Sequence, residues 1–192
     1  MPAKRPAPRL ALVSEQNMSE GQRALLASLR AGPRGASITP RGPFATWMHA
    51  PELGELAQKL GAYCRYGTPL PARLSEFAIL CTAHKWRAQY EWFAHAPMAA
   101  KGGVQPKTIE DLRRGRTPKS APKDERAIYD FIQELYKRRR VSTRTYKRVQ
   151  SLLGDKATVE LVGILGYYAL ISMTLNVFQM LPPENEKLAF PE

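Results

Sequence analysis

The sequence predicts an all-α protein, a bundle of helices packed around an apolar C-terminal helix. Two observations support this prediction. Apolar residues recur at helical spacing, as in Ile128, Phe131, Ile132 and Leu135. The chain also has no long alternating run of β-branched residues of the kind that forms strands. With 192 residues, of which 44% are hydrophobic, it is long enough to bury one core of ordinary size.

The N-terminal part of the chain predicts a flexible arm over residues 1–17, followed by a single helical domain over residues 18–192. Ser19 and Gln22 have the spacing of a capping box, so we expect a short helix from there through Leu29. Residues 32–43 hold three glycines and three prolines, which predicts a loop.

The next predicted helix runs from Pro51 to Gly67. Its apolar side chains are expected to face the core, namely Leu53, Leu56, Ala57, Leu60 and Cys64. A second helical segment follows over residues 72–101 and ends at Gly102-Gly103. This segment carries most of the residues with catalytic potential.

Further helices are predicted over residues 106–114, 123–139, 142–153 and about 155–181. The last of these contains twenty uncharged residues, 161–180, and so has the length of a membrane span. It also contains Ser172 and Asn176, and no cluster of basic residues follows it closely. A helix buried in the middle of a bundle has the same composition, so we expect a buried helix and no membrane partner.

The formal net charge of +12 and the pI of about 10.0 suggest a non-enzymatic alternative, a basic helical protein that binds nucleic acid or another partner. Cations are dense only at Arg113–Arg116 and Lys137–Arg140, near predicted helix ends, where they complement the helix dipole. No nucleic-acid-binding motif accompanies them. We therefore expect a solvated basic surface, no nucleic-acid partner, and attraction of small anionic organic substrates.

Cysteine usage and the N-terminus favour a cytoplasmic protein with reduced thiols. Cys64 and Cys81 form neither a C-x-x-C pair nor a zinc-binding spacing. Residues 1–9 lack the apolar core of a secretory signal. We expect no structural metal.

The densest group of reactive side chains lies within residues 73–95. Glu91 and His95 are four residues apart, so on a helix their side chains share a face and can meet. A carboxylate beside an imidazole suits proton transfer near neutral pH. Tyr90 and Trp92 would supply apolar walls around the pair.

The stretch 73–103 reads R-L-S-E-F-A-I-L-C-T-A-H-K-W-R-A-Q-Y-E-W-F-A-H-A-P-M-A-A-K-G-G, and it resembles the core motif of the carboxymuconolactone decarboxylase family. Residues 160–176 are similar to that family's final helix. The resemblance, which covers residues 53–181, implies an alkyl hydroperoxidase D-like helical bundle that assembles into trimers or hexamers. It also implies decarboxylation of a small carboxylated substrate without a cofactor. Glu76, Glu91 and His95 would be the catalytic residues.

The same superfamily includes thiol peroxidases that resemble alkyl hydroperoxidase D and carry a C-x-x-C motif before a histidine. If that histidine corresponds to His95, the two cysteines fall on Ala88 and Glu91, and neither is a cysteine here. Peroxidase activity is therefore the second hypothesis. It would depend on Cys81, which lies among apolar residues and has no resolving partner.

Three further polar residues are candidates for substrate binding. Arg73 could pair with Glu76 or hold a substrate carboxylate, His84 could face the same pocket, and Asn176 could contact the pocket from the final helix. Glu76 and Glu91 would lie about 22 Å apart on one straight helix. A shared site therefore requires a helix break, which we predict between residues 84 and 88.

Overall fold

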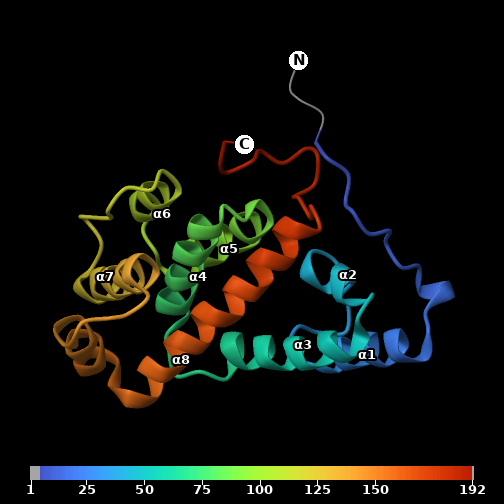
Figure 1. The fold of residues 1–192 in the computed structure, drawn as a ribbon, viewed down its shortest axis with the longest axis horizontal. Coiled ribbons are helices and arrows are strands. Elements are labelled where there is room, and N and C mark those ends of the chain that lie inside the picture. The colour runs from blue at the N-terminus through green and yellow to red at the C-terminus, as the bar shows by residue number, and fades with distance from the viewer. Residues whose placement is uncertain (1–4, 192) are drawn as a thin grey trace.

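The computed structural model describes residues 5–191 of the chain, which within this range forms helices and no strand (Figure 1). In chain order the elements are η1 (Glu15–Asn17), α1 (Glu20–Ala31), α2 (Pro43–Trp47), α3 (Pro51–Tyr66), α4 (Ala72–Trp86), α5 (Gln89–Gly102), α6 (Pro106–Arg113), α7 (Lys123–Arg138) and α8 (Thr143–Val177). The all-α prediction is confirmed.

Helix α4 lies at the centre of the molecule. Its residues 74–83 are buried without interruption, because α5, α6, α7 and α8 all pack against it. Burial of a side chain such as Phe77 or Leu80 contributes about 1.5–3 kcal/mol. A carboxylate on this helix, Glu76, is therefore held in apolar surroundings.

Helix α8 crosses the whole molecule and touches α2, α3, α4, α5 and α7 (Figure 1). Gly154, with a φ of 78°, interrupts it between the two predicted helices. Of the described helices, only α8 is long and apolar enough to cross a membrane, and 56% of its most apolar window is buried inside the protein. The apolar C-terminal helix is confirmed, but Val159, Val162 and Met173 remain exposed along its outer side.

The prediction that α3 buries its three leucines is wrong. Leu53, Leu56 and Leu60 are exposed, and only Ala57 and Cys64 of the predicted set are buried. The helix instead packs through its small residues, because these allow close approach. A Cβ atom on Gly54 would lie 2.7 Å from Leu25, and one on Gly61 would lie 1.9 Å from the hydroxyl of Tyr167.

The described part of the N-terminal arm lies against the segment that follows α8. The predicted capping box is present, with the Ser19 hydroxyl accepting from the backbone N–H of Gln22 at 3.3 Å. N-terminal to this capping box, the backbone N–H of Arg9 donates a hydrogen bond to the carbonyl of Phe178 at 3.0 Å. Residues 1–4 of the predicted flexible arm lie outside the described residues, and its flexibility stays a prediction.

Candidate active site

The chain turns sharply between α4 and α5, as predicted. Helix α4 ends at Trp86 and α5 begins at Gln89. Arg87 adopts the left-handed conformation, with a φ of 51°, and the backbone N–H of Ala88 donates to the carbonyl of Ala83 at 2.9 Å. The predicted break between residues 84 and 88 is therefore confirmed, although no glycine or proline marks it.

The left-handed conformation costs a non-glycine residue about 1–2 kcal/mol, and contacts from distant segments offset this cost. The Asn176 amide donates to the carbonyl of Trp86, the last residue of α4, at 2.7 Å. The Gln89 side chain bonds in both directions with the backbone of the C-terminal tail at Phe190. Tertiary contacts thus fix a turn that local sequence hardly signals.

The turn brings Glu76 of α4 against the imidazole of His95 on α5. Nδ1 of His95 lies 2.6 Å from Oε2 of Glu76, and Nε2 lies 3.3 Å from Oε2 of Glu91. All three side chains are buried. The ring of Tyr168 packs edge-on against the imidazole, with the ring centres 5.0 Å apart. Each ring nitrogen of His95 therefore faces its own carboxyl group.

The surroundings of Glu91 shift the pKa of its carboxyl group. Burial raises its pKa, and the negative charge of Glu76 acts in the same direction, whereas His95 and Arg65 oppose the rise. Its Oε2 atom is buried and makes no hydrogen bond with the residues that the structure describes. That atom faces Nε2 of His95 at 3.3 Å, so a proton can pass between Glu91 and the imidazole.

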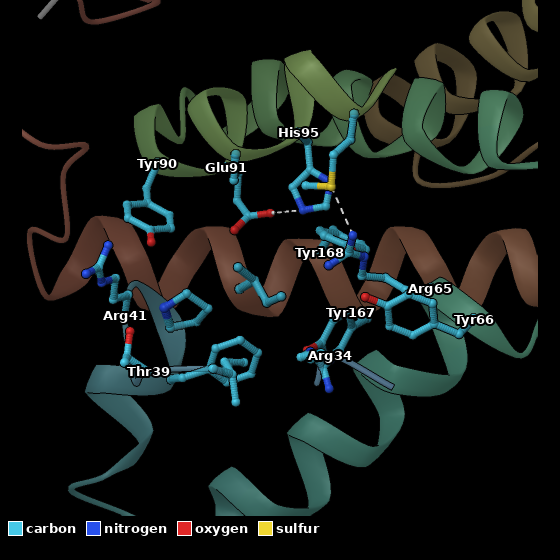
Figure 2. A pocket seen from close by; sticks show the side chains of 16 residues that line it. Arg34, Thr39, Arg41, Arg65, Tyr66, Tyr90, Glu91, His95, Tyr167 and Tyr168 are labelled. Carbon is cyan, nitrogen blue, oxygen red and sulfur yellow. Dashed lines mark hydrogen bonds and ion pairs between the residues drawn. The ribbon is translucent and has the colours of Figure 1, made fainter. Parts of the chain in front are cut away.

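A cavity of about 330 Å³ opens beside this pair (Figure 2). Its walls come from the loop between α1 and α2 and from α2, α3, α5 and α8. They are lined by Arg34, Ile38, Thr39, Arg41, Pro43, Phe44, Arg65, Tyr66, Tyr90, Glu91, Ala94, His95, Met98, Tyr167, Tyr168 and Ile171. Glu91 and His95 thus reach the cavity, whereas Glu76 lies behind the imidazole.

Of the two aromatic residues predicted to bind substrate, only Tyr90 lines the cavity. Trp92 is buried against Phe190 of the C-terminal tail, with ring centres 5.3 Å apart. The reason is their spacing along α5, since residues two positions apart on a helix point to different faces. The prediction for Trp92 as a substrate-binding residue needs correction.

Three polar candidates also lie outside the cavity. Arg73 pairs with Asp124 and Glu125 of α7, at 2.5 Å in each case, instead of with Glu76 or a substrate. His84 packs against Phe190, on the α6 side of α4. Asn176 is exposed and makes the structural hydrogen bond to the turn described above. For each of these residues, a partner within the chain replaces the expected substrate contact.

The sequence analysis missed the cationic side of the cavity. Arg34 and Arg41 come from the loop predicted over residues 32–43, and Arg65 comes from α3. Loops on a rigid scaffold often carry binding residues, so two arginines in a loop rich in glycine and proline were a usable signal. Tyr167, at the base of the cavity, gives no such signal because it sits in a long apolar helix.

No protein-family profile and no curated protein sequence matches the chain. A solved structure does match it: an uncharacterized peroxidase-related protein from Ralstonia eutropha JMP134, described as an alkylhydroperoxidase AhpD core. The superposition has a TM-score of 0.76 at 15% sequence identity and covers 94% of this chain and 95% of the other. The chain has the AhpD core fold. At this level of identity the likeness concerns the fold alone.

Within this AhpD core fold, the two cysteines lie away from the cavity. Both are free and buried, and burial raises the pKa of Cys64 to about 11 and that of Cys81 still further. Neither thiol is poised to form a thiolate near neutral pH. Among the described residues, no group of three or more His, Cys, Asp and Glu side chains is arranged to hold a metal ion.

Proposed function

We propose that this protein is a cofactor-free acid–base enzyme of the carboxymuconolactone decarboxylase type, a lyase acting on a small carboxylated substrate. One observation carries the proposal. His95 is held between two carboxyl groups at the wall of a cavity that also contains three arginines. Acid–base groups therefore meet a binding site for anions.

In the proposed chemistry, loss of carbon dioxide breaks a carbon–carbon bond and leaves its electron pair on the substrate carbon. That carbon must then receive a proton. Glu91, with its raised pKa, lines the cavity and supplies the proton directly. A proton from solvent water then returns to Glu91 by way of Nε2 of His95, which consumes one proton per turnover. Glu76 accepts from Nδ1–H of His95 and acts as a positioning residue, since it does not reach the cavity.

Peroxidase activity is the second candidate, and the peroxidase-related description of the structural neighbour favours it. Such chemistry needs an accessible thiolate. Cys64 and Cys81 are each only 3% exposed and do not line the cavity. Acid–base chemistry uses the groups that do line it, so we place it first.

The test measures release of carbon dioxide from carboxymuconolactone by the wild-type protein, by His95→Ala and by His49→Ala. A positioned general acid–base group contributes about 10²–10⁴-fold, so His95→Ala should lose activity by that factor. The side chain of His49 is exposed and, among the described residues, bonds only to the carbonyl of Ala11 in the arm, so the His49→Ala variant should keep full activity. No release by the wild type, or release that survives in His95→Ala, would refute the proposal. So would turnover of cumene hydroperoxide that depends on Cys81.

We also propose that the protein acts as a homo-oligomer, the trimer or hexamer that the family resemblance implies. An exposed apolar surface supports this. Leu53, Leu56 and Leu60 are exposed on α3, and Val159 and Val162 are exposed on α8, which packs against α3. We call these five residues the α3–α8 face. Apolar side chains exposed on neighbouring helices of a soluble protein can mark an interface.

A further inference from the structure

The arginines of the cavity differ from the other arginines discussed above. Arg73 and Arg113 are bound to carboxylates of the chain itself. Arg34 and Arg65 are also partly buried, yet within residues 5–191 neither forms an ion pair with a carboxylate. Arg34 donates only to Gln58, at 3.3 Å, and Arg65 donates to the sulfur of Met98, at 2.9 Å.

Partial burial of a cation is unfavourable unless hydrogen-bond acceptors or an anion replace the lost water. The aromatic rings of Phe44 and Tyr66, each 5.0 Å from a guanidinium group, supply part of this compensation. They leave the remaining N–H donors of both guanidinium groups without an anionic acceptor among the described residues. A guanidinium in this situation suits a planar carboxylate, which it can bind through two parallel hydrogen bonds.

A third group at the same end of the cavity lacks a partner. The hydroxyl of Tyr167 is buried and makes no hydrogen bond with the described residues, and the side chain as a whole is 3% exposed. Burial raises the pKa of Tyr167 well above its ordinary value, and both Arg34 and Arg65 are close enough to oppose that rise. The hydroxyl therefore stays protonated and can donate.

Figure 2 shows how these groups lie relative to the acid–base pair. Tyr167 and Arg34 lie across the cavity from Glu91 and His95, with Arg65 at the side, next to Tyr66. The space between is bordered by apolar side chains, including Phe44 and Ile171. A small ring would fill this space with one polar end toward each group.

We propose that Arg34, Arg65 and Tyr167 form a carboxylate-binding subsite, which holds the substrate by a carboxylate that the reaction leaves in place. This inference rests on the proposed function and deepens it, since it assigns one end of the substrate. The bound carboxylate fixes a small ring against the apolar wall and presents its far side to Glu91. The segment before α4, which supplies both arginines, thereby takes part in binding.

The test measures binding by calorimetry and does not depend on turnover. Benzoate is the probe and benzamide its neutral counterpart, with wild type, Arg34→Gln, Arg65→Gln and the exposed Arg126→Gln compared at one salt concentration. Loss of a hydrogen bond to a charged group should weaken benzoate binding about tenfold to a hundredfold in the first two variants. Arg126→Gln should bind like the wild type, and benzamide should bind weakly throughout.

Tyr167→Phe separates a binding role from a structural one. The hydroxyl has no partner among residues 5–191, so its removal should leave the melting temperature unchanged or raise it. The same variant should bind benzoate several-fold more weakly. A lower melting temperature with unchanged benzoate affinity would show that the hydroxyl is structural and would overturn the subsite.

Two further outcomes would also overturn the subsite. One is equal affinity for benzoate and benzamide, and the other is inorganic phosphate competing as strongly as benzoate. The His95→Ala variant should still bind benzoate even though it lacks turnover. Failure of the subsite and failure of the proposed lyase activity therefore give different results, because binding and release of carbon dioxide are measured independently.

Discussion

At the scale of single residues, Glu91 is where stability and the proposed chemistry oppose each other. Burial raises its pKa above the 4.5 of an unperturbed glutamate. A group whose pKa is higher in the folded state stabilises the fold fully below its unfolded pKa, and this contribution is lost as the pH rises through the folded value. Ionisation of Glu91 near neutral pH therefore lowers the free energy of unfolding.

This predicts that Glu91→Gln, which cannot ionise, becomes more stable than the wild type as the pH is raised. The two proteins should melt at similar temperatures near pH 4, and the variant should melt higher at pH 7 to 8. Thermal unfolding by circular dichroism across this range measures the difference, with Glu184→Gln in the exposed tail as the control. A variant that loses stability relative to the wild type with rising pH would contradict the prediction. The variant should also lose lyase activity.

The sequence allowed prediction of the acid–base residues but not of the residues around them. Helical spacing places Glu91 and His95 on one face, and this pair meets in the structure. The contact between Glu76 and His95 depends on the turn, which the family resemblance supplied. Arg34 lies in a loop rich in glycine and proline, a signal that the sequence analysis did not use, whereas Arg65 could not be predicted, because its place at the cavity depends on how α3 packs against the rest of the molecule. Periodicity does not encode that packing.

At the scale of elements, α8 contains a break that one residue permits. Gly154 has a φ of 78° and a ψ of 173°, a region of the Ramachandran map that is open almost only to glycine. A Cβ atom there would meet nothing within 4 Å, so any effect of a substitution comes from the backbone alone. The break sets the direction in which the apolar half of α8 leaves α7.

We therefore expect Gly154→Ala to lower the free energy of unfolding by about 1–3 kcal/mol. For a chain of this size, that corresponds to a fall in melting temperature of about 2–4 °C per kcal/mol. Ser151→Ala, three residues earlier on the exposed side of the same helix, should change stability by less than about 0.5 kcal/mol. Denaturant unfolding measures both. Equal stability of Gly154→Ala and the wild type would mean that α8 tolerates a straight path.

Helix α3 shows why the face of an element is harder to predict than its extent. Its start at Pro51 and its end before Gly67 were predicted correctly. The apolar side chains on it suggested a buried leucine face, yet the core contacts are made by Gly54, Ala57 and Gly61. Small residues permit the closer packing, and a pattern based on hydrophobicity alone favours the larger side chains. The leucines therefore remain exposed, on the α3–α8 face.

At the scale of the whole molecule, the all-α architecture followed from the sequence because most of the helices carry a local signal, although α2 was not predicted. Capping residues, prolines at helix starts and a 3.6-residue period all agree along the chain. The arrangement of the helices does not follow from such signals. The AhpD core fold of the neighbour, at 15% identity, shows that the arrangement survives extensive change in the residues that build it.

The α3–α8 face has a further property that favours close packing of another helix. Gly163 and Gly166 lie on the exposed side of α8, and a Cβ atom on either would meet nothing within 4 Å. Glycine within a helix costs about 0.5–1 kcal/mol of stability relative to alanine, and no contact within residues 5–191 explains the two glycines here. Close approach of the backbone of a second copy of the chain would explain why glycine occupies these two positions. The two exposed glycines therefore support the proposed homo-oligomer.

The prediction at this scale is that Leu56→Glu dissociates the oligomer without unfolding the subunit. Leu56 and Leu12 are both 70% exposed, so Leu12→Glu introduces the same charge at equal exposure outside the α3–α8 face. Sedimentation equilibrium at tens of micromolar should give the wild type and Leu12→Glu three or six times the 21.6 kDa of one chain. Leu56→Glu should fall toward 21.6 kDa with unchanged helical content, because a charge buried in an apolar interface is strongly unfavourable. A monomeric wild type would refute the oligomer, and a Leu56→Glu variant of unchanged mass would move the interface to another surface.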